Sequence, residues 1–173
     1  LFTLYRLLGA AESPWNLHLR TDLPSQTPAP EFEWLINGKI AQVIYSGHGQ
    51  YATSITHEGA PFPSLVISEQ RSSSEIQITR GAIAKPYLEN LTATLIDAQW
   101  QERQRSLRWQ SRAFAGHFVS ATIVSAQVPK KILVDQQILP AASWTAQQEE
   151  SKSYRTAINY SHALRDCEVL VEF

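Results

Sequence analysis

Hydrophobic and polar residues alternate along most of the chain after residue 50. In a β-strand successive side chains point to opposite faces, so this alternation predicts half-buried strands. Polar residues, glycine or proline separate the segments, and many short strands joined by polar turns are typical of a barrel or a sandwich. The strands expected on this basis cover residues 50–55, 64–68, 75–79, 91–100, 106–114, 118–125, 131–139, 154–160 and 168–173.

Three segments show other patterns. In residues 31–45 the apolar side chains are spaced as on one helix face, which predicts a helix that ends at Gly47 and Gly49. Residues 82–89 predict a short helix that starts near Pro86, because proline is tolerated in a first helical turn. Residues 1–11 predict a short amphipathic helix docked on the body, since this stretch is too short to span a bilayer.

The length of 173 residues favours one domain. Residues 25–30, SQTPAP, read as an extended proline-rich linker. We therefore expect an N-terminal arm with its linker over residues 1–30 and a β-barrel body over residues 31–173. The fold class expected is all-β or β-dominated.

The amino-acid composition excludes several classes of protein. Apolar residues make up 43% of the chain, which is enough for a sizeable core. A net charge of −1 argues against a protein that grips a nucleic-acid backbone, and no segment suggests a membrane span. The single cysteine, Cys167, allows no disulfide framework and no multi-cysteine metal site, so we expect a soluble protein and favour the cytoplasm. No two histidines have a close metal-ligand spacing, and we expect no metal.

Arginines cluster between residues 103 and 112. On a strand, Arg108 and Arg112 share one face. This pattern fits a solvated strand face whose charges mask an edge, and it also fits an anion site, because a guanidinium group suits phosphate. We favour the solvated face when the cluster is considered alone.

Residues 52–113 carry a resemblance to a known family. It rests on four pieces: YATSITHEGAPFPSLVIS from Tyr51, EIQITRGAIAK from Glu75, KPYLENLTATLI from Lys85, and WQERQRSLRWQSRA from Trp100. In this order they resemble the flavin-binding split-barrel family of pyridoxamine 5′-phosphate oxidase and its relatives. The resemblance implies a split β-barrel that binds FMN and acts as an oxidoreductase on a small molecule. It also implies a homodimer, because two chains usually share each flavin site in this family.

The resemblance assigns roles to five residues. Lys85 and Arg105 would hold the FMN phosphate, because cationic side chains neutralise a phosphate dianion. Thr79 and Ser64 would donate hydroxyl hydrogen bonds to its oxygens, and Trp109 would lie beside the flavin ring. No residue is singled out as a general acid or base, so enzyme activity is left open.

The second half of the chain supports an alternative. KKILVDQQILPAASW from Lys130, SYRTAINY from Ser153 and CEVLVEF from Cys167 resemble the C-terminal β-sandwich modules of many glycoside hydrolases. Residues 88–173 would then form an immunoglobulin-like sandwich of about seven strands. Its function would be non-catalytic, either structural or sugar-binding. Trp15, Trp34 and Trp144 would be the candidates for stacking on sugar rings.

Overall fold

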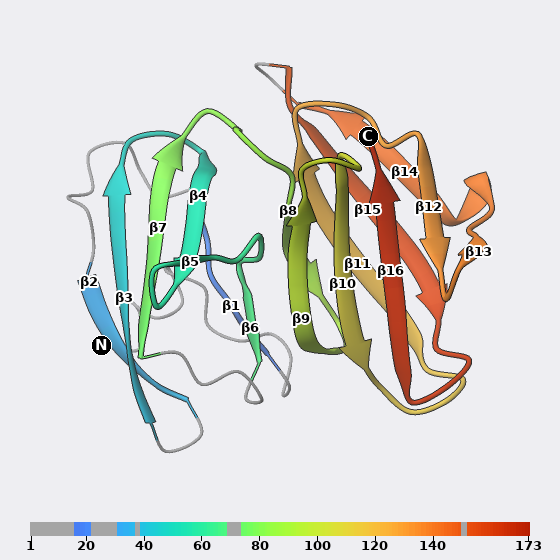
Figure 1. The fold of residues 1–173 in the computed structure, drawn as a ribbon, viewed down its shortest axis with the longest axis horizontal. Helices are drawn as coiled ribbons and strands as arrows, with labels where there is room; N and C mark the ends of the chain where they lie inside the picture. Colours follow the sequence, from blue (N-terminus) through green and yellow to red (C-terminus); the bar gives the residue numbers. More distant parts are fainter. Residues whose placement is uncertain (1–15, 22–30, 37–38, 69–73, 150–151) are drawn as a thin grey trace.

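The computed structural model describes residues 16–21, 31–36, 39–68, 74–149 and 152–173. Within these ranges the chain is built mainly from strands, and it contains a short 3-10 turn, η1 (Ala141–Ser143). The expectation of a β-dominated protein is confirmed. Figure 1 shows two lobes, with the N-terminal strands in one and the strands from β8 onward in the other.

The N-terminal lobe contains a five-stranded sheet in the order β2-β3-β7-β4-β5. β3 and β7 run parallel, and the other neighbours are antiparallel. A two-stranded sheet of β1 and β6 lies beside it (Figure 1). The strands are β1 (Asn16–His18), β2 (Glu31–Ile36), β3 (Lys39–Gly47), β4 (Tyr51–His57), β5 (Ala60–Pro61), β6 (Val66–Ser68) and β7 (Glu75–Gly81).

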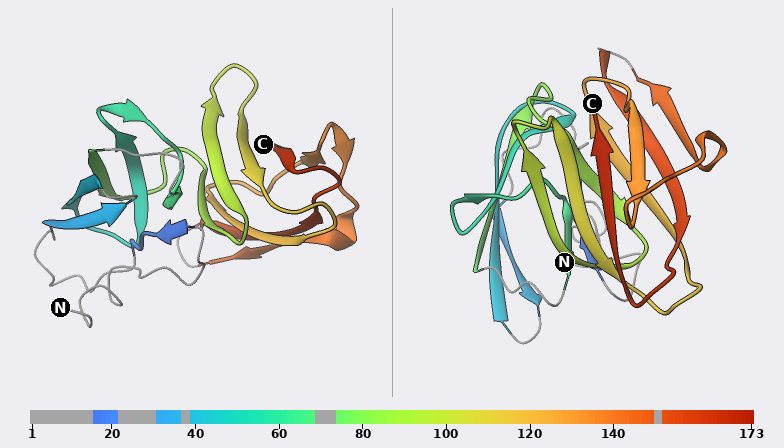
Figure 2. Two further views of the ribbon diagram at one scale, coloured as in Figure 1. Left: turned by 90° about the horizontal axis from the view of Figure 1, so that it is seen from below. Right: turned by 45° about the vertical axis from the view of Figure 1, so that its right-hand side comes forward.

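The C-terminal lobe is a β-sandwich. Its five-stranded sheet has the order β13-β12-β16-β10-β9, and its four-stranded sheet has the order β14-β15-β11-β8. Figure 2 shows the two sheets as separate layers. The strands are β8 (Tyr87–Leu91), β9 (Thr94–Gln101), β10 (Ser106–Arg112), β11 (Phe118–Ser125), β12 (Lys131–Val134), β13 (Gln137–Ile138), β14 (Trp144–Gln148), β15 (Tyr154–Ser161) and β16 (Asp166–Glu172).

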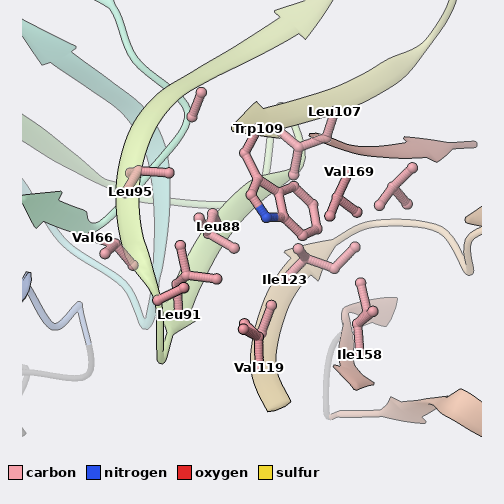
Figure 3. Close-up of a cluster of buried hydrophobic side chains, with 14 of the residues drawn as sticks. Val66, Leu88, Leu91, Leu95, Leu107, Trp109, Val119, Ile123, Ile158 and Val169 are labelled. Atoms are coloured by element: carbon pink, nitrogen blue, oxygen red, sulfur yellow. The ribbon is translucent and has the colours of Figure 1, made fainter. Parts of the chain in front are cut away.

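The core of the sandwich lies between these sheets. Trp109 is 1% exposed and packs in one buried cluster with Leu107 and Val169 of its own sheet and Ile123 of the facing sheet (Figure 3). Phe62 and Val66, from the N-terminal lobe, belong to the same buried cluster. The alternation seen in the sequence produces this core, because every second side chain of a strand faces the opposite sheet.

The described sheets do not close into a barrel. β9 and β13 are the two edges of one layer, and β8 and β14 are the two edges of the other. The split-barrel part of the expectation is therefore not seen, whereas the alternative, a sandwich over residues 88–173, matches the observed layers. Closure would require hydrogen bonding between these edges, and the four sheets remain separate instead.

Two predicted helices are corrected. Residues 31–45 form most of the β2–β3 hairpin, with Ile36 opposite Lys39. Ala41, Val43 and Tyr45 are buried at every second position, and this strand period outweighs the helical spacing. The short helix over residues 82–89 is replaced by an extended linker and the start of β8. Proline disfavours the helical conformation at the residue before it, here Lys85.

The expected N-terminal arm is only partly described. The predicted helix over residues 1–11 and the linker over residues 25–30 lie outside the described residues. Asn16, which falls within the predicted arm, begins β1 and is 4% exposed. The described part of residues 1–30 therefore packs on the body.

Candidate functional site

The two lobes are joined by direct hydrogen bonds. Leu65 N donates to Leu88 O (2.8 Å) and Leu88 N donates to Pro63 O (2.9 Å), so residues 63–65 cover the outer edge of β8. Asn16 Nδ2 donates to Leu91 O (3.0 Å) and Ala93 O (2.6 Å), and its Oδ1 accepts from Leu95 N (3.2 Å). These bonds fix the lobes relative to each other and hold the walls of the cleft described next.

An open cleft of about 670 Å³ lies between the lobes, which is within the range of small-molecule sites. One wall comes from β4, at residues 52–55, and from residues 61–63 after β5. The opposite wall comes from β9 and the turn after it, at residues 97–100 and Glu102. The linker at residues 84–87 closes one side of the cleft.

The cleft has an apolar floor and a polar rim. Phe62, Tyr87 and Ala98 are buried, at 1%, 2% and 2% exposure respectively. Ser54, Gln99 and Glu102 line the same cleft and are exposed. Because few polar groups surround an apolar surface, the cleft suits a ligand with both apolar faces and hydrogen-bonding groups.

Trp100 lies at the junction of floor and rim. Its register opposite Leu107 on β10 turns the indole toward the core face of the sheet, where it packs beside Phe173 with ring centroids 6.1 Å apart. Its Nε1 donates to Glu102 Oε2 (2.7 Å). The ring is half-buried, so part of it remains available to a ligand.

Glu102 also binds Lys85. Lys85 Nζ is 2.8 Å from Glu102 Oε2, and the side chains are 57% and 72% exposed. The hydrogen bond from Lys85, followed by that from Trp100, lowers the pKa of the Glu102 carboxyl below its usual value. Glu102 is therefore an ionised hydrogen-bond acceptor, which makes it unsuitable as a general acid.

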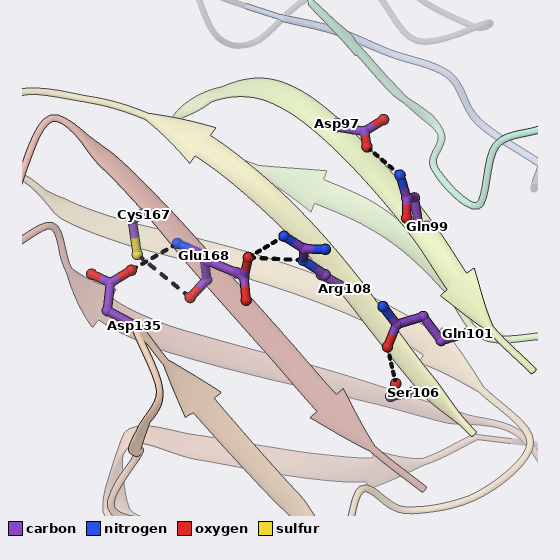
Figure 4. A network of polar contacts seen from close by, with 8 residues as sticks. All are labelled: Asp97, Gln99, Gln101, Ser106, Arg108, Asp135, Cys167 and Glu168. Carbon is purple, nitrogen blue, oxygen red and sulfur yellow. Dashed lines mark hydrogen bonds and ion pairs between the residues drawn. The ribbon is translucent and has the colours of Figure 1, made fainter. Parts of the chain in front are cut away.

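Polar side chains continue along the solvent face of the five-stranded sheet of the sandwich, which contains β9, β10 and β16 (Figure 4). Gln99 Nε2 donates to Asp97 Oδ2 (2.8 Å), and Ser106 Oγ donates to Gln101 Oε1 (3.1 Å). Asp97 and Gln99 also line the cleft. The amide and carboxylate oxygens of β9 therefore add acceptors to its polar rim.

The arginine cluster belongs to this face. Arg108 forms an ion pair with Glu168, and Arg112 forms one with Asp166 at 2.6 Å. The hydrogen bond with Asp166 raises the pKa of Arg112 and lowers that of Asp166. These cross-strand pairs with β16 fit the solvated face that we favoured.

The five residues assigned from the flavin resemblance are spread over the molecule. Lys85 lines the cleft. Arg105 stands in the β9–β10 turn with φ 49°, donates to Gln127 Oε1 (2.8 Å), and adds a small contribution to the lowered pKa of Glu102. Thr79 is exposed on β7, where its hydroxyl accepts from Ser46 Oγ (3.2 Å).

The other two are interior. Ser64 is fully buried, and its hydroxyl bonds the backbone of Val66 as acceptor (3.0 Å) and donor (3.1 Å). Trp109 lies in the sandwich core, where its Nε1 donates to Tyr160 OH (3.3 Å). The structure thus places Lys85 and Arg105 near the carboxylate of Glu102. It does not bring Thr79, Ser64 and Trp109 to the same place.

The tryptophans proposed for sugar stacking do not form the cleft. Trp15 and the side chain of Trp34 lie outside the described residues, and Trp144 packs against the sandwich core. The sequence reasoning missed Trp100, Gln99 and Glu102 as site residues. One sequence signal could have identified two of them. Trp100 stands two positions before Glu102 at the end of a strand, and this spacing permits a hydrogen bond from the indole to the carboxylate.

The described part of the chain contains no group of three or more histidine, cysteine, aspartate or glutamate side chains arranged to hold a metal ion. Among the described residues, no helix has the length and apolar character needed to cross a membrane.

No protein-family model matches the chain, and neither the curated proteins nor the solved structures contain a significant match to it.

Proposed function

We propose that this chain is a non-catalytic β-sandwich protein that binds carbohydrate in the cleft between β4 and β9. The observation that carries the proposal is the group of Trp100, Glu102 and Lys85 at the polar rim, above the apolar floor. The sandwich fold of residues 87–173 supports it, because the alternative drawn from the sequence combined this fold with sugar binding.

The chemistry of a sugar matches the cleft. A pyranose ring has apolar C–H faces and a rim of hydroxyl groups. Aromatic and other apolar side chains contact such faces, and charged or amide side chains bond the hydroxyls. Trp100, which is partly exposed, would supply the first kind of surface, and Gln99, Glu102 and Lys85 the second.

The state of Glu102 suits this residue to binding rather than to proton donation. Glycoside hydrolysis requires a carboxylic acid whose pKa is raised, so that it can protonate the leaving oxygen. The pKa of Glu102 is lowered instead. Its ionised carboxylate is suited to accept hydrogen bonds from sugar hydroxyls, and these charge-assisted bonds are stronger than neutral ones.

Native affinity electrophoresis tests the proposal. The protein migrates through gels that contain xyloglucan, galactomannan, glycogen or laminarin, and retardation measures binding. We expect retardation by at least one polymer, and we expect Trp100→Ala to weaken it about tenfold through loss of the aromatic contact. Phe114→Ala is the control, because Phe114 is 81% exposed and does not line the cleft.

Two results would overturn the proposal. One is unaltered migration in every gel. The other is retardation that Trp100→Ala leaves intact while thermal melts show a folded variant. Gln99→Ala gives an independent check, because Gln99 is exposed and its removal leaves the core unchanged.

FMN binding and the shared dimer site stay predictions from the resemblance over residues 52–113. They require Lys85 to exchange Glu102 for a phosphate group, and an absorbance titration with FMN tests them.

A further inference from the structure

At the rim of the cleft, a single carboxylate oxygen of Glu102 accepts two hydrogen bonds. Lys85 Nζ (2.8 Å) and Trp100 Nε1 (2.7 Å) both contact Oε2 of Glu102. Within the described part of the chain, Oε1 of Glu102 has no hydrogen-bonding partner, and Lys85 bonds no other group. An ammonium group carries three N–H donors, so two remain for a ligand.

We infer that the Lys85–Glu102 pair recognises a vicinal diol, that is, two neighbouring free hydroxyl groups on one sugar ring. This inference rests on the proposed function and specifies the class of sugar. The ammonium would donate a hydrogen bond to the oxygen of one hydroxyl, and Oε1 would accept a hydrogen bond from the next hydroxyl. Neighbouring ring hydroxyls that are gauche to each other, both equatorial as in glucose or one axial as in mannose, are close enough to bridge two contiguous charged groups, and both bonds are charge-assisted.

Trp100 is a positioning residue in this arrangement. Its indole N–H fixes Oε2, and this restricts the rotation of the Glu102 side chain, which is otherwise 72% exposed. A side chain held in one conformation loses less entropy when it binds a ligand. The same indole borders the apolar floor, so the diol and the ring face would be recognised together.

Diol recognition predicts that the glycosidic linkage of a polysaccharide determines how tightly it binds. A 1,4-linked glucan or mannan keeps free hydroxyls at positions 2 and 3 of every unit. A 1,3-linked glucan has its free ring hydroxyls at positions 2 and 4, which are not adjacent. We expect retardation by xyloglucan, galactomannan or glycogen, and about tenfold weaker binding to laminarin, a 1,3-linked glucan.

Periodate gives a test on a single polymer. It cleaves the bond between two adjacent hydroxyl-bearing carbons, and borohydride then reduces the aldehydes. We expect the oxidised and reduced form of a bound polymer to lose about tenfold in affinity, because the diol no longer exists on a ring. A polymer treated with borohydride alone is the control.

Two substitutions assign the effect to the pair. Glu102→Gln keeps an acceptor for Trp100 and removes the charge, and Lys85→Met removes the ammonium while keeping the aliphatic stem. We expect each to weaken binding about tenfold and to reduce the preference for the untreated polymer. Arg105→Met is the matched control, since Arg105 is an exposed cation in the same turn as Glu102 and its side chain bonds Gln127 instead.

The outcomes separate the two proposals. Equal binding of treated and untreated polymer, or equal binding of laminarin and xyloglucan, overturns diol recognition and leaves sugar binding standing. Wild-type affinity in both the Glu102→Gln and the Lys85→Met protein would likewise overturn diol recognition and leave sugar binding standing. Absence of retardation by every polymer overturns sugar binding and diol recognition together.

Discussion

The hydroxyl of Ser153 donates a 2.6 Å hydrogen bond to the hydroxyl of Tyr51, across 102 positions of sequence. Tyr51 begins β4 in the N-terminal lobe, and Ser153 precedes β15 in the sandwich. Both residues are buried, at 6% and 2% exposure. The bond therefore ties the lobe that carries one wall of the cleft to the lobe that carries the other.

Tyr51→Phe removes this bond and little else. We expect a loss of about 1 kcal/mol in the free energy of unfolding, the usual net value of one hydrogen bond, measured by urea denaturation. A double-mutant cycle with Ser153→Ala isolates the pair. A coupling energy of zero would show that the bond contributes nothing to the junction.

A buried polar network crosses the far end of the sandwich core. Ser111 Oγ lies 3.1 Å from His162 Nε2 and 3.2 Å from Tyr160 OH, and His162 is 1% exposed. His162→Leu leaves the Ser111 hydroxyl with one partner fewer, and we expect a cost of about 1–3 kcal/mol. The matched control is His117→Leu, at an exposed position, which we expect to change stability by less than about 0.5 kcal/mol. Equal effects of the two substitutions would contradict a structural role for the network.

Cys167 makes stability depend on alkaline pH. Burial is the main cause that raises the pKa of its thiol from 9.0 to about 12. The unfolded chain therefore loses the thiol proton at lower pH than the folded chain, so the contribution is complete below pH 9 and is lost as the pH rises toward 12. We expect Cys167→Ala to flatten the decline of the urea midpoint over this range. A decline with the same slope in both proteins would show that the thiol does not titrate as stated.

Flavin binding is measured by absorbance. If the assigned residues hold FMN, the visible bands of the cofactor shift when protein is added, and Lys85→Ala with Arg105→Ala abolishes the shift. Trp109→Phe is not a useful probe, because Trp109 is buried in the core and its substitution affects folding. An FMN spectrum that the wild-type protein leaves unchanged would contradict the prediction. Sedimentation of the same sample at micromolar concentration would test the homodimer.

The predictability of the fold from sequence varies with the range of the interactions. In β16, Cys167, Val169 and Val171 are buried and Glu168 and Glu172 are not, so the alternation alone identifies the strand and its inner face. In β2 and β3 the apolar residues also satisfy a helical spacing, and the pairing of Phe32 with Val43 across the hairpin decides between the two. Strand pairing of this kind depends on tertiary structure, and the local sequence pattern does not reveal it.

The site was less predictable than the fold for the same reason. Lys85 was selected from its motif and lies in the cleft, but its partner Glu102 is on a turn that only the arrangement of the lobes brings near. Ser64 and Trp109 were selected from strand offsets, and those offsets do not distinguish a barrel mouth from a closed interior. Trp100 borders the cleft because β9 is an edge strand, which the order of the sheet determines.

Phe62, which follows β5, and Val66, in β6, complete the hydrophobic core of a lobe to which their own segments do not belong. A fragment that begins at β8 would leave holes where these side chains pack, and a cavity of that kind costs a protein several kcal/mol. We therefore expect the two lobes to unfold as one cooperative unit, although their sheets are separate. Heating should melt both in a single transition, and the chain should be studied whole.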